Sequence, residues 1–291
     1  MRKVLVTGGT GLIGTHLLQL FGPQNEVYAV SRSGLVPGAT HTLNIDLGQS
    51  WSTTDLPRDI DCIVHLAQSE HYRDFPKQVE DVFAVNTLST VKLLKYAQET
   101  GVKNFVLASS GGVYGSGIAH FSEEMDILAK GELGFYIGTR LCSEILSECY
   151  EKWMNVVTLR LFFVYGEGQR HNMLIPRLVD SVLSGRPIQL RGEFGLSINP
   201  VHVSDAVRCV HKAMSLQGSH KINVGGPDVL SLRRIAEIIG EALNRQPALD
   251  VQPSTGDTNL IGDISRMKLL LCVPEVRFEQ GVRAYLASLA G

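Results

Sequence analysis

The sequence has 291 residues, a formal net charge of -2 and a hydrophobic fraction of 44%, which suits one large or two modest domains with a substantial core. It contains no run of the roughly 18 to 20 apolar residues that a membrane helix requires and no signal-peptide core, which predicts a cytoplasmic protein that binds no membrane. Its interspersed charges give no basic face for nucleic acid. The five cysteines lack C-x-x-C spacing, which predicts free, buried thiols and no metal site.

The first expected strand, residues 4–6, leads into three glycines spaced three apart, Gly8, Gly11 and Gly14. Apolar residues then recur at helical spacing from Leu12. A strand, a glycine turn and a helix in this order are typical of a site where a dinucleotide pyrophosphate meets a helix N-terminus. A side chain at Gly8 or Gly11 would hold the diphosphate away from the backbone, and one at Gly14 would hold the helix off the strand.

The glycine turn resembles the T-G-x-x-G-x-x-G of the extended short-chain dehydrogenase/reductase family, here TGGTGLIG at residues 7–14. Members of this family, of the NAD-dependent epimerase/dehydratase type, modify nucleotide sugars. The resemblance implies an α/β fold, a Rossmann-like doubly wound parallel sheet with a smaller, interleaved C-terminal substrate lobe. The dinucleotide-binding core is expected over residues 1–165 and 197–225, and the substrate lobe over 166–196 and 226–291. Leu12 and Ile13 are expected beside the cofactor.

The second expected strand, residues 26–30, ends in Ser31, Arg32 and Ser33. An NAD site usually has Asp or Glu here, about 20 residues beyond the glycines, to accept hydrogen bonds from the ribose hydroxyls. A carboxylate would repel the extra phosphate of NADP, whereas hydroxyls and a guanidinium would hold it. These three residues therefore favour NADP as the cofactor, with NAD as the alternative.

Several short segments resemble family segments that line the cofactor. The acidic segment at residues 44–47 implies a carboxylate that accepts the adenine amino group. The strand at residues 61–67 resembles one that ends in H-L-A-A, with Gln68 in place of the second Ala, and His65 is expected to be structural. A helical pattern over residues 82–98 contains a V-N-T resembling the family's V-N-x-x-G-T without its glycine. The residues that the resemblance places beside the cofactor are Asp46, Leu47, Leu66, Ala67, Gln68, Asn86 and Ser109.

The chemistry is expected between residues 105 and 140. SSGGVYG at residues 109–115 resembles the family's S-S-x-x-V-Y-G, and YIGTR at residues 136–140 stands where the family has Y-x-x-x-K. Residues four apart share a helix face, so Tyr136 and Arg140 can project together toward a nicotinamide ribose. The resemblance implies that the Tyr136 phenol passes a proton to or from a sugar oxygen that Ser110 also hydrogen-bonds.

The sequence departs from the family pattern at positions that matter for function. Arg140 keeps the positive charge of the usual Lys, but its guanidinium is planar, bulkier and never neutral. Gly111 and Gly112 replace the acid and base with which dehydratases act, which disfavours 4,6-dehydratase activity. Phe163 replaces an Asn that contacts the sugar or phosphate in many relatives, and Ile198 replaces an Arg that grips the diphosphate.

The leading hypothesis is an NAD(P)-dependent reductase of a 4-keto nucleotide sugar, with a nucleotide-sugar 4-epimerase as the alternative. A cofactor-binding protein with weak or no catalysis is a second alternative, motivated by Arg140, Phe163 and Ile198 together. A homodimer is also expected, formed by the helices 82–98 and 136–152 of each copy. Its basis is an apolar helix face made by Leu141, Ile145, Leu146, Cys149 and Trp153.

Overall fold

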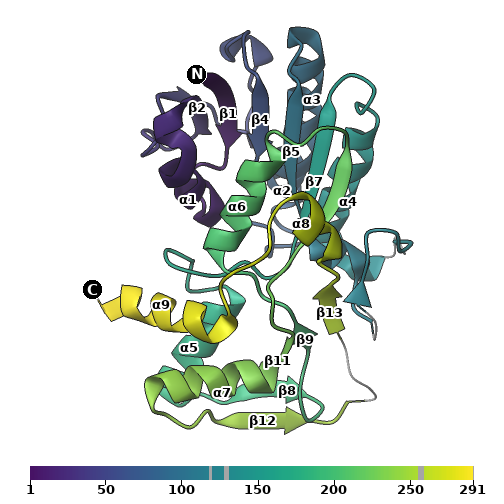
Figure 1. Cartoon of the computed structure of the whole chain (residues 1–291). Coiled ribbons are helices and arrows are strands. Elements are labelled where there is room, and N and C mark those ends of the chain that lie inside the picture. Colours follow the sequence, from purple (N-terminus) through teal and green to yellow (C-terminus); the bar gives the residue numbers. More distant parts are fainter. Residues whose placement is uncertain (118–119, 128–130, 255–258, 291) are drawn as a thin grey trace. The chain divides into compact units, whose positions relative to one another are not determined.

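The computed structural model describes residues 1–117, 120–127, 131–254 and 259–290 (Figure 1). The chain divides into two compact units. The first contains residues 1–113, 127–160 and 207–222, and the second contains residues 114–126, 161–206 and 223–291. Which unit binds dinucleotide and which binds substrate stays a prediction from the sequence.

The first unit is built on a seven-stranded sheet with the order β10-β7-β5-β4-β1-β2-β3 (Figure 1). β1 is parallel to β2 and β4, β2 to β3, and β4 to β5. The strand order reverses beside β1, and such a switch point in a doubly wound sheet is where ligands bind. The expected α/β fold with a parallel sheet is therefore confirmed. The strands are β1 (Arg2–Thr7), β2 (Asn25–Ser31), β3 (His41–Asn44), β4 (Cys62–His65), β5 (Asn104–Ser110), β7 (Asn155–Leu161) and β10 (His220–Val224).

Apolar helix faces cover this sheet. Leu93, Leu94 and Ala97 of α3 pack with strand residues such as Leu5 and Phe105 in one buried cluster. The helix expected over residues 82–98 is longer and is interrupted by a π-helical turn, a feature that often occurs at functional sites. The helical segments here are α1 (Leu12–Phe21), α2 (Val79–Phe83), the π turn (Ala84–Leu88), α3 (Ser89–Thr100) and α4 (Gly134–Glu148).

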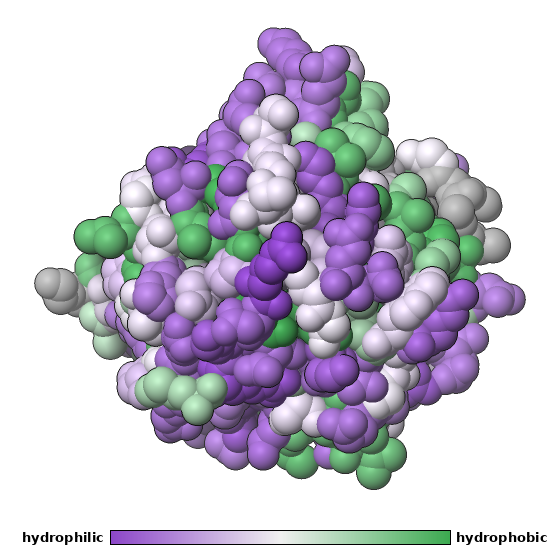
Figure 2. Space-filling model, turned by 90° about the horizontal axis from the view of Figure 1, so that it is seen from above, coloured by the Kyte–Doolittle hydropathy of each residue, from purple (hydrophilic) through white to green (hydrophobic). Residues whose placement is uncertain are grey.

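Helix α4 has its polar residues inside and its apolar residues outside. Its buried residues are Thr139, Arg140, Ser143, Glu144 and Ser147. In contrast, Ile145 is 55% exposed and Leu146 is 37% exposed. Cys142 and Cys149 are exposed as well, so the expectation of buried thiols is wrong for these two cysteines. Figure 2 shows a mostly hydrophilic surface with scattered hydrophobic patches, and a row of exposed apolar side chains on one helix is unusual on such a surface.

The second unit has its own apolar core, in which Ile198, Val179 and Ile239 are buried together. Its strands form one sheet with the order β11-β9-β13-β6 and a two-stranded sheet of β12 and β8. Among the described helices of the whole chain, none is long and apolar enough to cross a membrane. The remaining elements are β6 (His120–Phe121), α5 (Leu174–Ser184), β8 (Ile188–Arg191), β9 (Ser197–Ile198), α6 (Val203–Ala213), β11 (Leu230–Ser231), α7 (Leu232–Leu243), β12 (Leu249–Gln252), β13 (Asn259–Gly262), α8 (Ser265–Leu270) and α9 (Phe278–Ala290).

Candidate active site

The turn between β1 and α1 can be built only from glycine at two positions. Gly8 has φ +74°, and a Cβ placed there would lie 2.8 Å from the backbone N of Ala67. A Cβ on Gly14 would lie 2.2 Å from the carbonyl oxygen of Gly8. Gly11 is the N-cap of α1 and donates its N–H to that same oxygen at 3.0 Å. The glycines therefore let the end of β1, the turn and the start of α1 pack closely, which is the arrangement that brings a dinucleotide pyrophosphate to a helix N-terminus.

The end of β2 carries a cation that is already paired. Ser31 is buried, and its Oγ accepts the N–H of exposed Ser33 at 3.2 Å. Arg32 Nη2 donates to Glu70 Oε1 at 2.7 Å, and this hydrogen bond raises the pKa of Arg32. Glu70 belongs to the loop after β4, and the pairing was missed from sequence because the two residues are 38 positions apart.

The segment expected near the adenine also has defined contacts. Asp46 Oδ1 accepts the backbone N–H of Gly48 at 2.9 Å, and Leu47 beside it is buried. Leu12, Ile13 and Leu66 are half-buried, and their place beside the cofactor stays a prediction. The carboxylate of Asp46 is half-buried and has further acceptor capacity for an amino group.

His65, at the end of β4, is a structural residue. It is fully buried, with Nδ1 2.6 Å from Thr7 Oγ1 and Nε2 3.0 Å from Thr90 Oγ1. The Thr90 hydroxyl donates to the Asn86 carbonyl oxygen, so Nε2 of His65 must donate to Thr90 and Nδ1 must accept from Thr7. Burial and the charge of Arg140 lower the pKa of His65 to about 3. The ring is therefore neutral.

Asn86 is buried in the π turn and holds the loop after β4. Its Oδ1 accepts the N–H of Ser69 at 3.0 Å, and its Nδ2 donates to Thr139 Oγ1 at 3.0 Å. Ser69 also donates through Oγ to Asp81, and its Oγ accepts the N–H of His71 at 3.1 Å. Both ends of the Asn86 side chain are thus used inside the protein, in a positioning role that the sequence did not indicate.

Tyr136, Arg140 and Gln68 form one hydrogen-bonded group at the carboxyl ends of β4 and β5. The Tyr136 hydroxyl donates to Gln68 Oε1 at 2.8 Å. Arg140 is 2% exposed and donates to Ala67 O at 3.0 Å, to Ala108 O at 3.3 Å and to Gln68 Oε1 at 3.3 Å. Its guanidinium carbon is 5.9 Å from the centre of the Tyr136 ring. The helix thus brings Tyr136 and Arg140 together, as their spacing predicts, and Gln68 joins them.

The two serines that end β5 have different surroundings. Ser109 is buried, and its Oγ donates to Glu144 of α4. Ser110 is half-buried, and its Oγ accepts the N–H of Gly112 at 3.1 Å. A Cβ on Gly112 would lie 2.6 Å from Ile137 Cδ1, so this loop fits closely against α4. Ser110 is therefore the serine whose hydroxyl is accessible to a ligand, and Ser109 contributes to the support of α4.

Two departures from the family pattern lie in the second unit. Ile198 is fully buried in the core of that unit, so it takes part in packing. Phe163 has φ +46°, a conformation that is uncommon for a bulky residue and is often found at functional sites.

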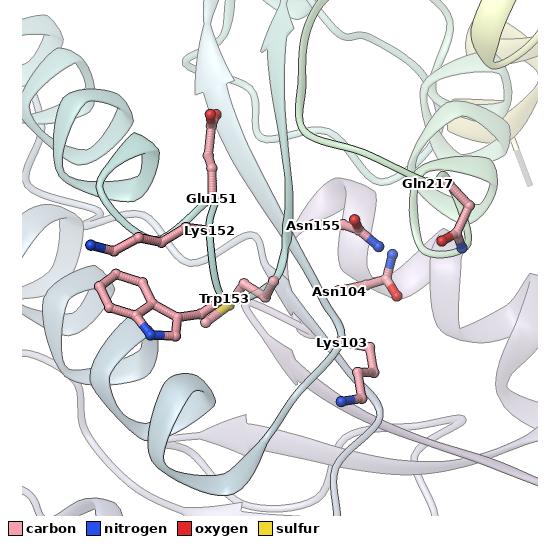
Figure 3. Close-up of a pocket in the computed structure, with 8 residues that line it drawn as sticks. Lys103, Asn104, Glu151, Lys152, Trp153, Asn155 and Gln217 are labelled. Carbon is pink, nitrogen blue, oxygen red and sulfur yellow. The ribbon is translucent and has the colours of Figure 1, made fainter.

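A cavity of about 430 Å³ lies elsewhere in the first unit, beside the residues that begin β5 and β7 (Figure 3). Asn104 donates to the Leu216 carbonyl oxygen at 3.0 Å, and Asn155 Oδ1 accepts the Gly218 N–H at 3.0 Å. These asparagines hold the segment around Gln217. The cavity is at the amino ends of the strands, whereas the candidate site is at the carboxyl ends.

Comparison with known proteins identifies the family. Residues 4–225 match the NAD dependent epimerase/dehydratase family. The uncharacterized UDP-glucose epimerase YtcB of Bacillus subtilis is 27% identical, covering 99% of this chain and 98% of its own. The dTDP-4-dehydro-6-deoxy-D-allose reductase of a Streptomyces species is 25% identical, covering 91% of this chain and 89% of its own.

A solved structure, MoeE5 in complex with UDP-glucose and NAD, has a TM-score of 0.86 at 27% identity, covering 99% of this chain and 98% of its own. The match to the family extends over the glycine turn, Ser110, Tyr136 and Arg140. The chain belongs to the NAD-dependent epimerase/dehydratase family.

Proposed function

We propose that the protein is an enzyme that transfers hydride to or from a ring carbon of a nucleotide sugar, and that it works as a 4-keto-sugar-nucleotide reductase. One observation carries this proposal. The Tyr136 hydroxyl lies beside Gln68, in the unit whose glycine turn joins β1 closely to α1. Ligands of doubly wound sheets bind beyond the carboxyl ends of the strands, where both features lie.

The roles of the residues follow from their hydrogen-bonding capacity. A bound nicotinamide dinucleotide supplies the hydride that the carbonyl carbon of the sugar receives. Tyr136 gives its hydroxyl proton to the carbonyl oxygen, which thereby becomes an alcohol. Ser110 accepts the Gly112 N–H through a lone pair and can donate its own proton to the same oxygen.

We propose NADP as the preferred cofactor, with NAD as the alternative. Gly8, Gly11 and Gly14 would hold the pyrophosphate, Asp46 the adenine, and Arg32 the additional phosphate. Ser31 in place of a carboxylate supports NADP, whereas the complex of MoeE5 with NAD supports the alternative. The charge of Glu70 beside Arg32 bears directly on this choice.

The glycine pair supports a reductase over a dehydratase. Ile137 fills the space where a side chain of residue 112 would lie, so an acid cannot be accommodated there without displacing Ile137. A 4-epimerase is the second candidate, and the Bacillus subtilis relative named as a UDP-glucose epimerase favours it. A protein with weak or no catalysis is the third, since Arg140, Phe163 and Ile198 all depart from the family pattern.

The exposed apolar residues of α4 support a homodimer. Ile145, Leu146 and Trp153 are exposed on or next to this helix. An apolar groove of about 510 Å³, lined by residues that include Phe135 and Leu141, lies beside them. We propose that a second copy of the chain covers this face.

Two measurements test the proposed function. The first mixes the purified protein with NADPH and UDP- or dTDP-linked 4-keto sugars and follows nicotinamide absorbance, where a reductase consumes NADPH and forms one alcohol for each NADPH oxidised. The second identifies the nucleotide released on denaturation, since tightly held oxidised cofactor indicates an epimerase. Absence of any turnover with keto sugars or nucleotide sugars would leave the third candidate.

A further inference from the structure

Gln68 accepts two hydrogen bonds at one oxygen atom. Its Oε1 lies 2.8 Å from the Tyr136 hydroxyl and 3.3 Å from Arg140 Nη2. Gln68 and Arg140 are two of the positions where the sequence departs from the family pattern it resembles, Gln for Ala and Arg for Lys. The structure therefore brings two departures into direct contact, at the residue expected to move the proton.

Arg140 is held firmly in place. It is 2% exposed, and its two terminal nitrogens donate to the carbonyl oxygens of Ala67 and Ala108. These carbonyls belong to the loop after β4 and to β5. A planar guanidinium carries donors on separate nitrogen atoms, so it can bond both carbonyl oxygens at once. An ammonium group would have to reach both from a single nitrogen. The position of the guanidinium is thus set by the backbone of β5 and of the loop after β4.

The backbone around Gln68 is also held. The neighbouring Ser69 donates its N–H to the buried Asn86 side chain, and the Ala67 N–H donates to Thr7 Oγ1 at 3.2 Å. Bonds on either side fix the path of the chain, so the remaining freedom of Gln68 lies in its side chain. That side chain is exposed toward solvent, and Arg140 and Tyr136 hold its carboxamide.

The hydrogen-bond roles in this group allow one arrangement. A guanidinium only donates, so the Gln68 atom that faces Arg140 is the carbonyl oxygen. The Tyr136 hydroxyl faces that same oxygen and must also donate. If the carboxamide rotated, its NH₂ group would face the guanidinium, and two donors would oppose each other.

We infer that Gln68, oriented by Arg140, is a positioning residue that holds Tyr136 as a protonated hydrogen-bond donor. This arrangement keeps Tyr136 protonated until a keto sugar is bound, when the hydroxyl would turn its single proton from Gln68 to the carbonyl oxygen, so the inference rests on the proposed function for its chemical meaning. Arg140 acts on the Tyr136 hydroxyl through the carboxamide, in addition to the direct cation–π contact of its guanidinium with the ring. In a chain with Ala and Lys at these positions, this connection would be absent.

Tyrosine NMR tests the inference without substrate. The protein is labelled with ¹³C at the ring carbon that bears the hydroxyl, whose chemical shift follows the hydrogen bond of the phenol, and Tyr136→Phe assigns the signal. Gln68→Ala is expected to shift the Tyr136 signal. Arg140→Lys is expected to shift it in the wild type and to shift it less in the Gln68→Ala background, where only the direct contact of residue 140 with the ring remains. Gln98→Ala, at an exposed position of α3, is the matched control and leaves the signal in place. An unmoved Tyr136 signal in Gln68→Ala, or an equal effect of Arg140→Lys in both backgrounds, overturns the inference.

Single-turnover reduction of a keto sugar adds a kinetic readout. Gln68→Ala is expected to lower the single-turnover rate constant at saturation about tenfold with little change in the half-saturation constant, and to have less than about a twofold effect when Arg140→Lys is present. Independent, multiplicative effects of the two changes would count against the inference while leaving the proposed function intact. An inactive wild type would refute the proposed function, and the NMR result would still decide whether Gln68 links Arg140 to Tyr136.

Discussion

Arg160 of β7 binds the Glu144 carboxylate of α4 through two nitrogens, with Nη2 2.7 Å and Nε 3.1 Å from Oε2. Their side chains are 2% and 1% exposed. Ser109 of β5 donates to the other carboxylate oxygen. The buried ion pair therefore connects α4, the helix that carries Tyr136, to β7, and the Ser109 hydrogen bond connects the same carboxylate to β5, the strand that ends at Ser110.

Glu144→Gln is expected to destabilise the protein strongly, because it leaves the Arg160 guanidinium buried without its countercharge. Loss of one partner of a buried pair costs about 3 to 5 kcal/mol. Glu148→Gln on the same helix breaks an exposed pair with Lys221 and is the matched control, with a cost below about 1 kcal/mol. Urea denaturation of both variants measures their free energies of unfolding. Equal losses of this free energy in the two variants would contradict a larger contribution from the buried pair.

The neutral, buried His65 makes stability depend on pH. Burial and the charge of Arg140 lower the pKa of His65 from its ordinary value of 6.5 to about 3 in the folded protein. Between these values the unfolded chain binds more protons than the folded one, so the free energy of unfolding falls as the pH falls from about 6.5 toward 3.

The expected slope from one proton is about 1.4 kcal/mol per pH unit. His65→Asn removes the titrating group and should reduce the slope of the free energy of unfolding against pH by up to this amount. The slope is compared because the substitution can also change the free energy of unfolding at pH 7. Denaturation at several pH values checks it. Parallel curves for the wild type and the variant would contradict the expectation.

The Arg32–Glu70 pair is expected to govern cofactor choice. Arg32→Ala should weaken NADP binding by about 1.5 to 3 kcal/mol, the value of a hydrogen bond to a charged group, while NAD binding changes little. Glu70→Gln should strengthen NADP binding, up to about fivefold, because the carboxylate no longer competes with the phosphate for the guanidinium and exposed pairs are worth up to about 1 kcal/mol. Calorimetric titration of both dinucleotides measures this. A wild-type preference for NAD, or equal losses of both cofactors in Arg32→Ala, would refute NADP selection by this pair.

The apolar outer face of α4 should be the dimer interface. Ile145→Glu removes about 1.5 to 3 kcal/mol of apolar burial from a packed interface and should raise the dimer Kd at least tenfold, by about 1.4 kcal/mol per factor of ten. Leu269→Glu makes the same change at another exposed apolar position, which is 82% exposed on α8, and should leave the mass unchanged. Light scattering over a range of concentrations gives the masses, and a monomeric wild type throughout would exclude the dimer.

The sequence predicts local features of this fold well. The glycine turn follows from steric limits within a few residues, and the pairing of Tyr136 with Arg140 on one helix face follows from helical periodicity. Both features depend on neighbours in the chain, which a sequence pattern records directly. The parallel sheet pairs distant strands, such as β1 with β4, and it was expected only because the sequence resembles the family.

Contacts between distant segments could not be predicted in this way. Gln68 and Tyr136 are 68 positions apart, and no local pattern shows that their side chains meet. Ser109 was expected beside the cofactor, yet its hydroxyl donates to Glu144, 35 positions away. The apolar residues of α4 reveal an amphipathic helix, but the periodicity does not tell which face the fold buries.

The polar inner face of α4 determines how precisely the Tyr136 side chain is oriented. Apolar packing is nondirectional, so a helix held by it can rotate a little about its axis at small cost. Hydrogen bonds and ion pairs depend on angle, and Arg140, Ser143 and Glu144 have partners in three different segments, the loop after β4, the π turn and β7. Together these contacts fix the rotation of α4 about its axis. Tyr136 therefore faces the loop after β4 before any substrate binds.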